Sequence, residues 1–101
     1  MHTTLNYSPN FDTKKRKLKD IKFIVFHYTG MKNEKKSFTK LTNIRSKVSS
    51  HYFIRNNGEV VTLVPNLYVA WHAGVSRWKK YKSLNQFSIG IEISNPGHNF
   101  T

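Results

Sequence analysis

The stretch that most constrains the fold is IKFIVFHYTG, residues 21–30, in which an apolar run ends on His27. The run is rich in β-branched and aromatic residues and shows no alternation, which is typical of a strand buried on both faces. Thr29 and Gly30 then suit a turn. His27 should therefore lie at the C-terminal end of a buried strand, where open α/β sheets place ligands. A core histidine bonded to a neighbouring carbonyl stays open as an alternative.

The chain is strongly basic, with a formal net charge of +12 at pH 7. We expect residues 1–20 to form a basic flexible leader, because they contain Lys14, Lys15, Arg16, Lys17 and Lys19 and no long apolar stretch. We expect one folded domain over residues 21–101. The charge favours polyanionic partners, although charge runs are also simply solvated. Because no zinc-finger, KH or RRM signature accompanies it, we expect no specific nucleic-acid partner.

Missing residue types and segments narrow the class of protein further. The 101 residues include no cysteine, so no disulfide can form and a metal site would have to use His, Asp or Glu. The chain has no signal-like segment and no run of about 18 apolar residues. We therefore expect no membrane span and a cytoplasmic location, with export by another route left open. We also expect a monomer.

Apolar residues recur every three to four positions after the first strand, at Phe38, Leu41, Ile44 and Val48. This spacing predicts an amphipathic helix over residues 33–48, which begins with Asn33 as its N-cap and packs on the sheet. Two β-rich runs follow the helix. The Asn57-Gly58 pair between them predicts a hairpin over about residues 51–64, with a type I′ turn.

Two later segments carry candidate functional residues. In VAWHAG, residues 69–74, Trp71 and His72 lie among small residues, a composition typical of loops that line clefts. A core anchor is the alternative for Trp71. Residues 87–94 alternate strictly, which predicts a strand with one face in the core, formed by Ile89, Ile91 and Ile93.

Glu92 lies on the opposite face of that strand, among the small residues Ser88, Gly90 and Ser94. Small neighbours leave room for a ligand above the sheet. A sheltered carboxylate needs a cation, a hydrogen-bond donor or a raised pKa. A solvated glutamate on an edge strand is the alternative.

His27 and Glu92 together fit a zinc hydrolase, in which histidine holds the metal and a glutamate that is not a ligand accepts a proton from water. A catalytic zinc generally takes three protein ligands. The remaining histidines, His2, His51, His72 and His98, do not show the i, i+4 spacing of a helical zinc motif. Spacing alone therefore assigns no complete site.

Four motifs follow one another along the chain: FHYTG at residues 26–30, VSSHY at 48–52, WHAGVSRW at 71–78 and LNQFSIGIEISN at 84–95. Together they resemble the zinc-dependent N-acetylmuramoyl-L-alanine amidase type 2 family, which is related to the peptidoglycan recognition proteins. The resemblance implies an α/β fold, with a mixed β-sheet flanked by helices and a zinc cleft on one face. It also implies a cell-wall hydrolase that acts on peptidoglycan or muropeptide, at the amide joining N-acetylmuramic acid to L-alanine of the peptide stem.

The resemblance implies roles for individual residues. His27 matches the family's first zinc ligand. Glu92 matches its catalytic glutamate, the general base for a zinc-activated water. Substrate contact is expected at residues that match positions near the family's cleft, namely Tyr28, His51, Trp71, His72 and Asn85.

In that family the other two zinc ligands, a histidine and an aspartate, come well after the glutamate strand. This chain ends at Thr101, and His98 is too close to Glu92 to match the second ligand. We therefore expect residues 21–101 to be the N-terminal portion of an amidase domain, truncated at the C-terminus, with an incomplete zinc site and little or no activity alone. Three alternatives stay open: a non-catalytic module that binds peptidoglycan or muropeptide, a basic polyanion-binding protein, and a fragment without a stable fold.

Overall fold

The structure is a computed structural model that describes residues 3–73, 77–78 and 81–95. Its main sheet has five strands in the order β1-β5-β4-β9-β3. In chain order these are β1 (Thr3–Leu5), β3 (Phe23–Tyr28), β4 (Tyr52–Ile54), β5 (Val60–Thr62) and β9 (Ser88–Ile93). β4 and β5 are antiparallel and the other neighbours are parallel. The predicted α/β fold with a mixed sheet is confirmed.

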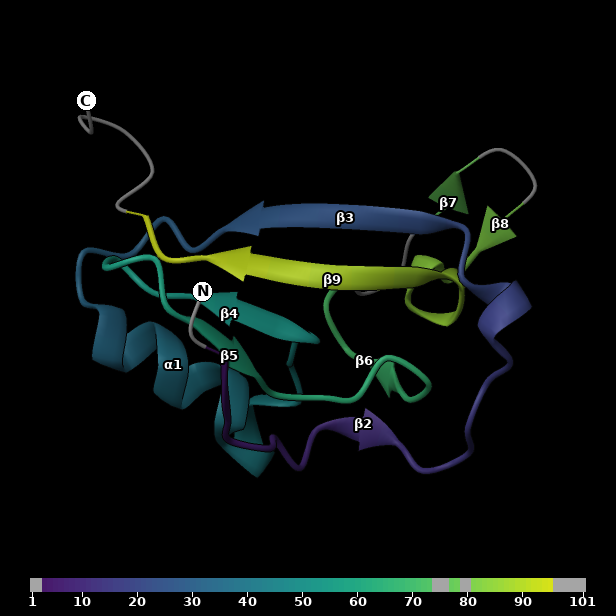
Figure 1. The fold of residues 1–101 in the computed structure, drawn as a ribbon, viewed down its shortest axis with the longest axis horizontal. Coiled ribbons are helices and arrows are strands. Elements are labelled where there is room, and N and C mark those ends of the chain that lie inside the picture. Colours follow the sequence, from purple (N-terminus) through teal and green to yellow (C-terminus); the bar gives the residue numbers. More distant parts are fainter. Residues whose placement is uncertain (1–2, 74–76, 79–80, 96–101) are drawn as a thin grey trace.

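One α-helix, α1 (Glu34–Thr42), occurs in the described ranges and lies along one side of the sheet (Figure 1). Two small antiparallel pairs accompany the main sheet: β2 (Phe11–Asp12) with β6 (Val69–Ala70), and β7 (Arg77–Trp78) with β8 (Tyr81–Lys82). Short 3₁₀ helices are η1 (Leu18–Asp20), η2 (Ile44–Ser46) and η3 (Leu84–Phe87). In these ranges no helix has the length and apolar character needed to cross a membrane.

The hydrophobic core lies between α1 and the sheet. Phe38 of α1 meets Phe53 of β4 edge to face, with ring centroids 5.7 Å apart. The buried apolar side chains that gather there are Leu41, Phe53, Val61, Leu63, Val64 and Ala70. The cluster holds the helix against β4 and β5, and β4 is the neighbour of β9 in the sheet.

The helix begins at the predicted residue but ends earlier than the predicted residue 48. Asn33 is its N-cap, and its side chain accepts a hydrogen bond from the N–H of Lys36 at 3.0 Å. Asn43 ends the helix in an extended conformation, and its side chain accepts instead from the N–H of Arg45 at 2.9 Å. Such a local bond competes with the helical pattern. Ile44 is 67% exposed as a result, so it does not extend the apolar stripe.

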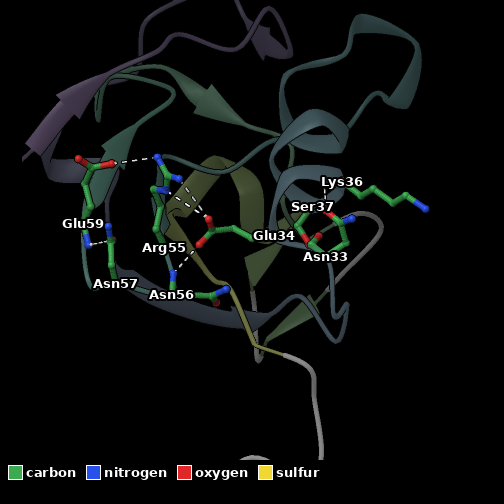
Figure 2. Close-up of polar contacts among 8 residues, drawn as sticks. All are labelled: Asn33, Glu34, Lys36, Ser37, Arg55, Asn56, Asn57 and Glu59. Atoms are coloured by element: carbon green, nitrogen blue, oxygen red, sulfur yellow. Dashed lines mark hydrogen bonds and ion pairs between the residues drawn. The ribbon is translucent and has the colours of Figure 1, made fainter.

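Figure 2 shows how the start of α1 is joined to the hairpin. The Glu34 carboxylate accepts hydrogen bonds from the Arg55 guanidinium, at 3.3 Å to both Nε and Nη2, and from the backbone N–H of Asn56. Arg55 also pairs with Glu59 at 3.2 Å. A carboxylate in the first helical turn also suits the helix dipole. The contacts are part-exposed and orient the helix more than they stabilise it.

The predicted hairpin is confirmed, but the predicted type I′ turn is wrong. The N–H of Gly58 donates to the carbonyl of Arg55 at 2.9 Å, which places Asn56 and Asn57 at the centre of the turn. Gly58 has a φ of +88°, whereas neither asparagine is left-handed. Glycine therefore serves as the left-handed residue of a bulge that follows the turn.

Residues 3–20 do not form the separate flexible leader expected from their charge. β1 extends the main sheet by pairing with β5, and β2 pairs with β6. Ser8 is buried and donates to the carbonyl of Leu41 at 2.6 Å, and Arg16 is only 8% exposed. The expected leader did not take this burial into account, because the buried residues of the segment are polar and are held by hydrogen bonds to the main chain. Such residues give no hydrophobic pattern in the sequence.

The faces of the sheet are also reversed relative to the prediction. In β3, Ile24, Phe26 and Tyr28 are 59–62% exposed, whereas His27 faces the side covered by α1. The register pairs these three exposed residues with the isoleucines of β9, so the isoleucine face is not the core face. Among the described residues β3 is thus buried on one face only. The core side of β9 carries its small residues instead, which makes space for the candidate site.

Candidate functional site

A cavity of about 240 Å³ lies at the C-terminal end of β3, next to α1 and the segment after β6. It brings together five residues expected at the site, which are His27, Tyr28, Trp71, His72 and Glu92. The remaining lining consists of Thr29, Met31, Ser37, Lys40, Leu41, Val48 and Ser49. Segments far apart in the sequence therefore meet around one concave surface, as ligand sites commonly do.

His27 and Glu92 are neighbours across two parallel strands, because the register of β3 and β9 pairs them directly. Paired residues of this kind lie on the same face of a sheet. On the other side of Glu92 the register places Phe53, which is fully buried. Burial raises the pKa of the Glu92 carboxyl, and the positive charge of Lys40 opposes the rise. The pair thus combines an imidazole with a carboxyl group whose proton affinity is increased.

His72 joins the two sides of the site. Its Nδ1 lies 3.0 Å from Nε2 of His27, and its Nε2 lies 2.9 Å from Oγ of Ser88. The rings of His27 and His72 are nearly edge to face, with centroids 5.2 Å apart. Burial lowers the pKa of His72 to about 3, helped by the neighbouring His27, His51 and Arg16. Burial also lowers the pKa of His27, so both imidazoles are neutral at physiological pH.

Trp71 forms part of the cavity wall and is fixed at both ends. Its indole N–H donates to Oδ1 of Asp12 at 2.8 Å, and its backbone N–H donates to Oγ of Ser49 at 2.9 Å. The residue is half-buried. The sequence left two roles open for Trp71, a wall of the cleft and an anchor in the core, and the structure shows part of each. Asp12 belongs to β2, which shows again that the first twenty residues contribute to the site.

His51 does not line the cavity, contrary to the expected substrate contact. Its side chain is completely buried. Nδ1 accepts from the N–H of Gly90 at 3.0 Å, and Nε2 then donates to the carbonyl of Tyr68 at 2.8 Å. Burial lowers the pKa of His51 to about 4, which fits this neutral ring. Because no part of the ring is accessible, the described structure gives it a structural position behind the site.

Asn85 also lies outside the cavity lining, so its position does not fit the direct substrate contact that was expected. Its Oδ1 accepts from the backbone N–H groups of His72 at 3.1 Å and Ala73 at 2.8 Å. Asn85 therefore acts on the cavity through the backbone that carries His72. The rest of the WHAGVSRW motif, residues 74–76, lies outside the described residues.

Two residues of the site were missed by the sequence reasoning. Arg16 donates to the carbonyls of Asn66, Asn85 and Gln86 at 2.9–3.1 Å and so supports η3. In the sequence, Arg16 is distinguished only as an arginine within a run of lysines, and such a run predicts exposed charge. Lys40 lines the cavity from α1, and nothing distinguished it from the other helix lysines.

The donor set fits one position of a metal site. Nε2 of His27 is engaged with His72, whereas no hydrogen bond to its Nδ1 occurs among the described residues. A neutral imidazole next to a carboxyl group suits zinc. In the described ranges, however, no three His, Cys, Asp or Glu side chains group closely enough to hold a metal ion. His2 and His98 lie outside those ranges.

Glu92→Gln is expected to stabilise the protein at neutral pH and to lose this effect at about pH 4, below the ordinary pKa of glutamate. A raised carboxyl pKa means that the folded state binds the proton more tightly than the unfolded state. The stabilising contribution of Glu92 is therefore complete below its unfolded pKa and disappears as the pH rises through the raised value. Urea unfolding of both proteins at the two pH values checks this. An equal difference at both would contradict it.

Over residues 17–101 the sequence matches the family described as N-acetylmuramoyl-L-alanine amidase. The N-acetylmuramoyl-L-alanine amidase AmiD of Escherichia coli K12 is 43% identical over 84 residues, which cover 76% of this chain and 29% of AmiD. The 1,6-anhydro-N-acetylmuramyl-L-alanine amidase AmpD of the same organism is 46% identical over 56 residues, covering 55% of this chain and 30% of AmpD.

A similar solved structure is the complex of E. coli AmiD with the substrate anhydro-N-acetylmuramic acid-L-Ala-D-γ-Glu-L-Lys. It matches with a TM-score of 0.66 at 40% identity, over 85% of this chain and 36% of that one. AmpDh3 of Pseudomonas aeruginosa in complex with anhydromuramic pentapeptide matches with a TM-score of 0.70 at 33% identity, over 87% of this chain and 38% of that one. The chain spans about three tenths of the length of the two curated relatives.

Proposed function

Because this chain belongs to the N-acetylmuramoyl-L-alanine amidase family, we propose that it supplies part of the active site of a zinc-dependent peptidoglycan hydrolase. The bond cleaved is the amide between N-acetylmuramic acid and L-alanine of the peptide stem. The observation that carries the proposal is the pairing of His27 with Glu92 in a cavity walled by Trp71. The muropeptides named in the AmiD and AmpDh3 complexes support the same class of substrate for this chain.

Five residues of the cavity have proposed roles. His27 would hold zinc through Nδ1, and zinc would supply Lewis-acid activation of the attacking water. Glu92 takes a proton from that water as general base and returns it to the departing L-alanine nitrogen. Its raised pKa suits the first step, because a carboxylate with increased proton affinity is a stronger base. Trp71 contacts substrate at the wall, and His72 lies behind His27. Tyr28 borders the cavity at the end of β3, but its side chain lies on the opposite, exposed face of the sheet, so the substrate contact expected of it is limited to the rim.

A second candidate function is binding of muropeptide without cleavage. The described residues favour it in one respect, because they offer one metal-ligand position and no group of three. Zinc generally needs three protein ligands for catalysis. We therefore propose that the 101-residue chain by itself binds zinc weakly and is inactive or nearly so.

The chain is expected to release no stem peptide from anhydro-N-acetylmuramyl-L-Ala-D-γ-Glu-L-Lys above the level given by Glu92→Gln, with or without added Zn²⁺. Calorimetric titration should show Zn²⁺ binding far weaker than the roughly 10–16 kcal/mol of complete structural sites. Mass spectrometry of the released peptide provides the first readout. Release that a chelator abolishes would contradict the proposed inactivity and support a complete site in this chain.

A further inference from the structure

We infer that His72 is a positioning residue, which acts through His27 by accepting its Nε2–H and so leaving Nδ1 free to bind a metal. The inference rests on the proposed function in one respect, namely that His27 is a metal ligand. It assigns His72 a role different from the substrate contact expected from the sequence. Three consecutive hydrogen bonds join Leu84, Ser88, His72 and His27, and their directions determine which nitrogen of His27 carries the proton.

The directions follow from the last bond of the series. Oγ of Ser88 lies 2.6 Å from the carbonyl oxygen of Leu84, which can only accept, so the single hydroxyl proton of Ser88 points there. Ser88 must then accept at its contact with Nε2 of His72, 2.9 Å away. His72 therefore carries its proton on Nε2 and has a lone pair on Nδ1. Across the 3.0 Å contact the donor must be Nε2–H of His27.

Gly90 of β9 packs directly against the His72 ring and fixes its position. An added Cβ at Gly90 would collide with Cγ, Cδ2 and Nδ1 of His72, so the imidazole occupies the space that only glycine leaves. Gly90 is itself held by His51, whose backbone N–H donates to its carbonyl at 2.9 Å and whose Nδ1 accepts its N–H at 3.0 Å. These two bonds fix the position of Gly90, and the close approach of Gly90 limits movement of the His72 ring towards β9.

The backbone of His72 is fixed as well, by Oδ1 of Asn85. Both ring nitrogens and the backbone N–H of His72 are thus engaged, which is more than packing of a buried ring requires. Metal-binding histidines commonly donate their second N–H to a carboxylate or a carbonyl, and this bond orients the ring. Here the acceptor is a neutral imidazole, which orients His27 without adding negative charge to the site.

Two variants of the full 101-residue chain separate positioning from packing. His72→Phe keeps the ring volume and removes the acceptor, whereas His72→Asn loses the ring and retains an acceptor oxygen near the place of Nδ1. Long-range ¹H–¹⁵N spectra report the tautomer of His27 and the rate at which its Nε2–H exchanges with water. We expect the Nε2–H form with slow exchange in the parent chain and in His72→Asn. In His72→Phe, exchange should be at least about fivefold faster, as expected for one lost hydrogen bond.

Slow exchange retained in His72→Phe and lost in His72→Asn would overturn the inference and make His72 a packing residue. A proton on Nδ1 of His27 in the parent chain would also overturn it. Zn²⁺ added to the parent chain separately tests the proposed function, because the largest ¹⁵N shift in His27 should fall on Nδ1. No shift at either nitrogen would contradict the metal role while the spectra without metal still decide the hydrogen bond.

Discussion

Arg16→Ala is expected to lower the free energy of unfolding by about 2–4 kcal/mol, the effect of removing a buried charged donor from several acceptors. Arg16 is 8% exposed and donates to the carbonyls of Asn66, Asn85 and Gln86. The substitution leaves these carbonyls without their donor. A domain of this size has only about 5–15 kcal/mol of stability in total. The loss is therefore a large fraction, and urea unfolding measures it.

Lys17→Ala provides the matched control, because Lys17 is the adjacent cation and is exposed. Its effect should stay within about 0.5 kcal/mol, as for most surface substitutions. The two variants change net charge equally, so the comparison removes any general effect of charge. Similar losses in the two variants would contradict the account and restore the interpretation of residues 1–20 as a solvated leader.

Gly90→Ala is expected to damage both stability and ligand binding. The added methyl group must displace the His72 ring or shift β9, at a cost of about 1–3 kcal/mol for overpacking. Displacing His72 breaks its contact with His27 and changes the cavity wall. We expect affinity for anhydro-N-acetylmuramyl-L-Ala-D-γ-Glu-L-Lys to fall by at least about tenfold, which equals 1.4 kcal/mol. Calorimetry measures the affinity, and thermal unfolding measures the stability.

Gly58→Ala separates these two effects. Gly58 has a φ of +88° and no atom near the place of an added Cβ, so alanine is strained there without any clash. The cost should be about 1–2 kcal/mol, close to that of Gly90→Ala. No residue of the turn lines the cavity, and binding should be unchanged. Equal losses of affinity in both variants would mean that global destabilisation, rather than His72, accounts for the Gly90→Ala result.

The strands that carry His27 and Glu92 could be predicted because each has a strong local pattern. An apolar β-rich run ends on the histidine, and strict alternation places the glutamate among small residues. The alternation identified the two faces of β9 but not which one is covered. Isoleucine suggests the core by its hydrophobicity, yet α1 packs on the face of Ser88 and Gly90, where small residues admit the imidazole of His72.

The supporting contacts could not be predicted, because they are polar and join residues distant in sequence. Arg16 is 69 residues from Asn85, and His27 is 45 residues from His72. Neither contact produces a hydrophobic period or a local motif. The resemblance to the amidase family named His51 and Asn85 as contact residues near the cleft, but their positions one layer behind it depend on the packing of β9 and η3.

Mapping of muropeptide binding by ¹H–¹⁵N spectra tests the central claim most directly, because it locates the ligand without requiring catalysis. Titration with anhydro-N-acetylmuramyl-L-Ala-D-γ-Glu-L-Lys should shift backbone or side-chain signals of Tyr28, Lys40, Trp71, His72 and Glu92, which line the cavity. Signals of the second cavity, between β1 and α1 and lined by Leu5, Phe38 and Arg55, should not move. Shifts confined to that second cavity, or no shifts at saturating ligand, would contradict the account.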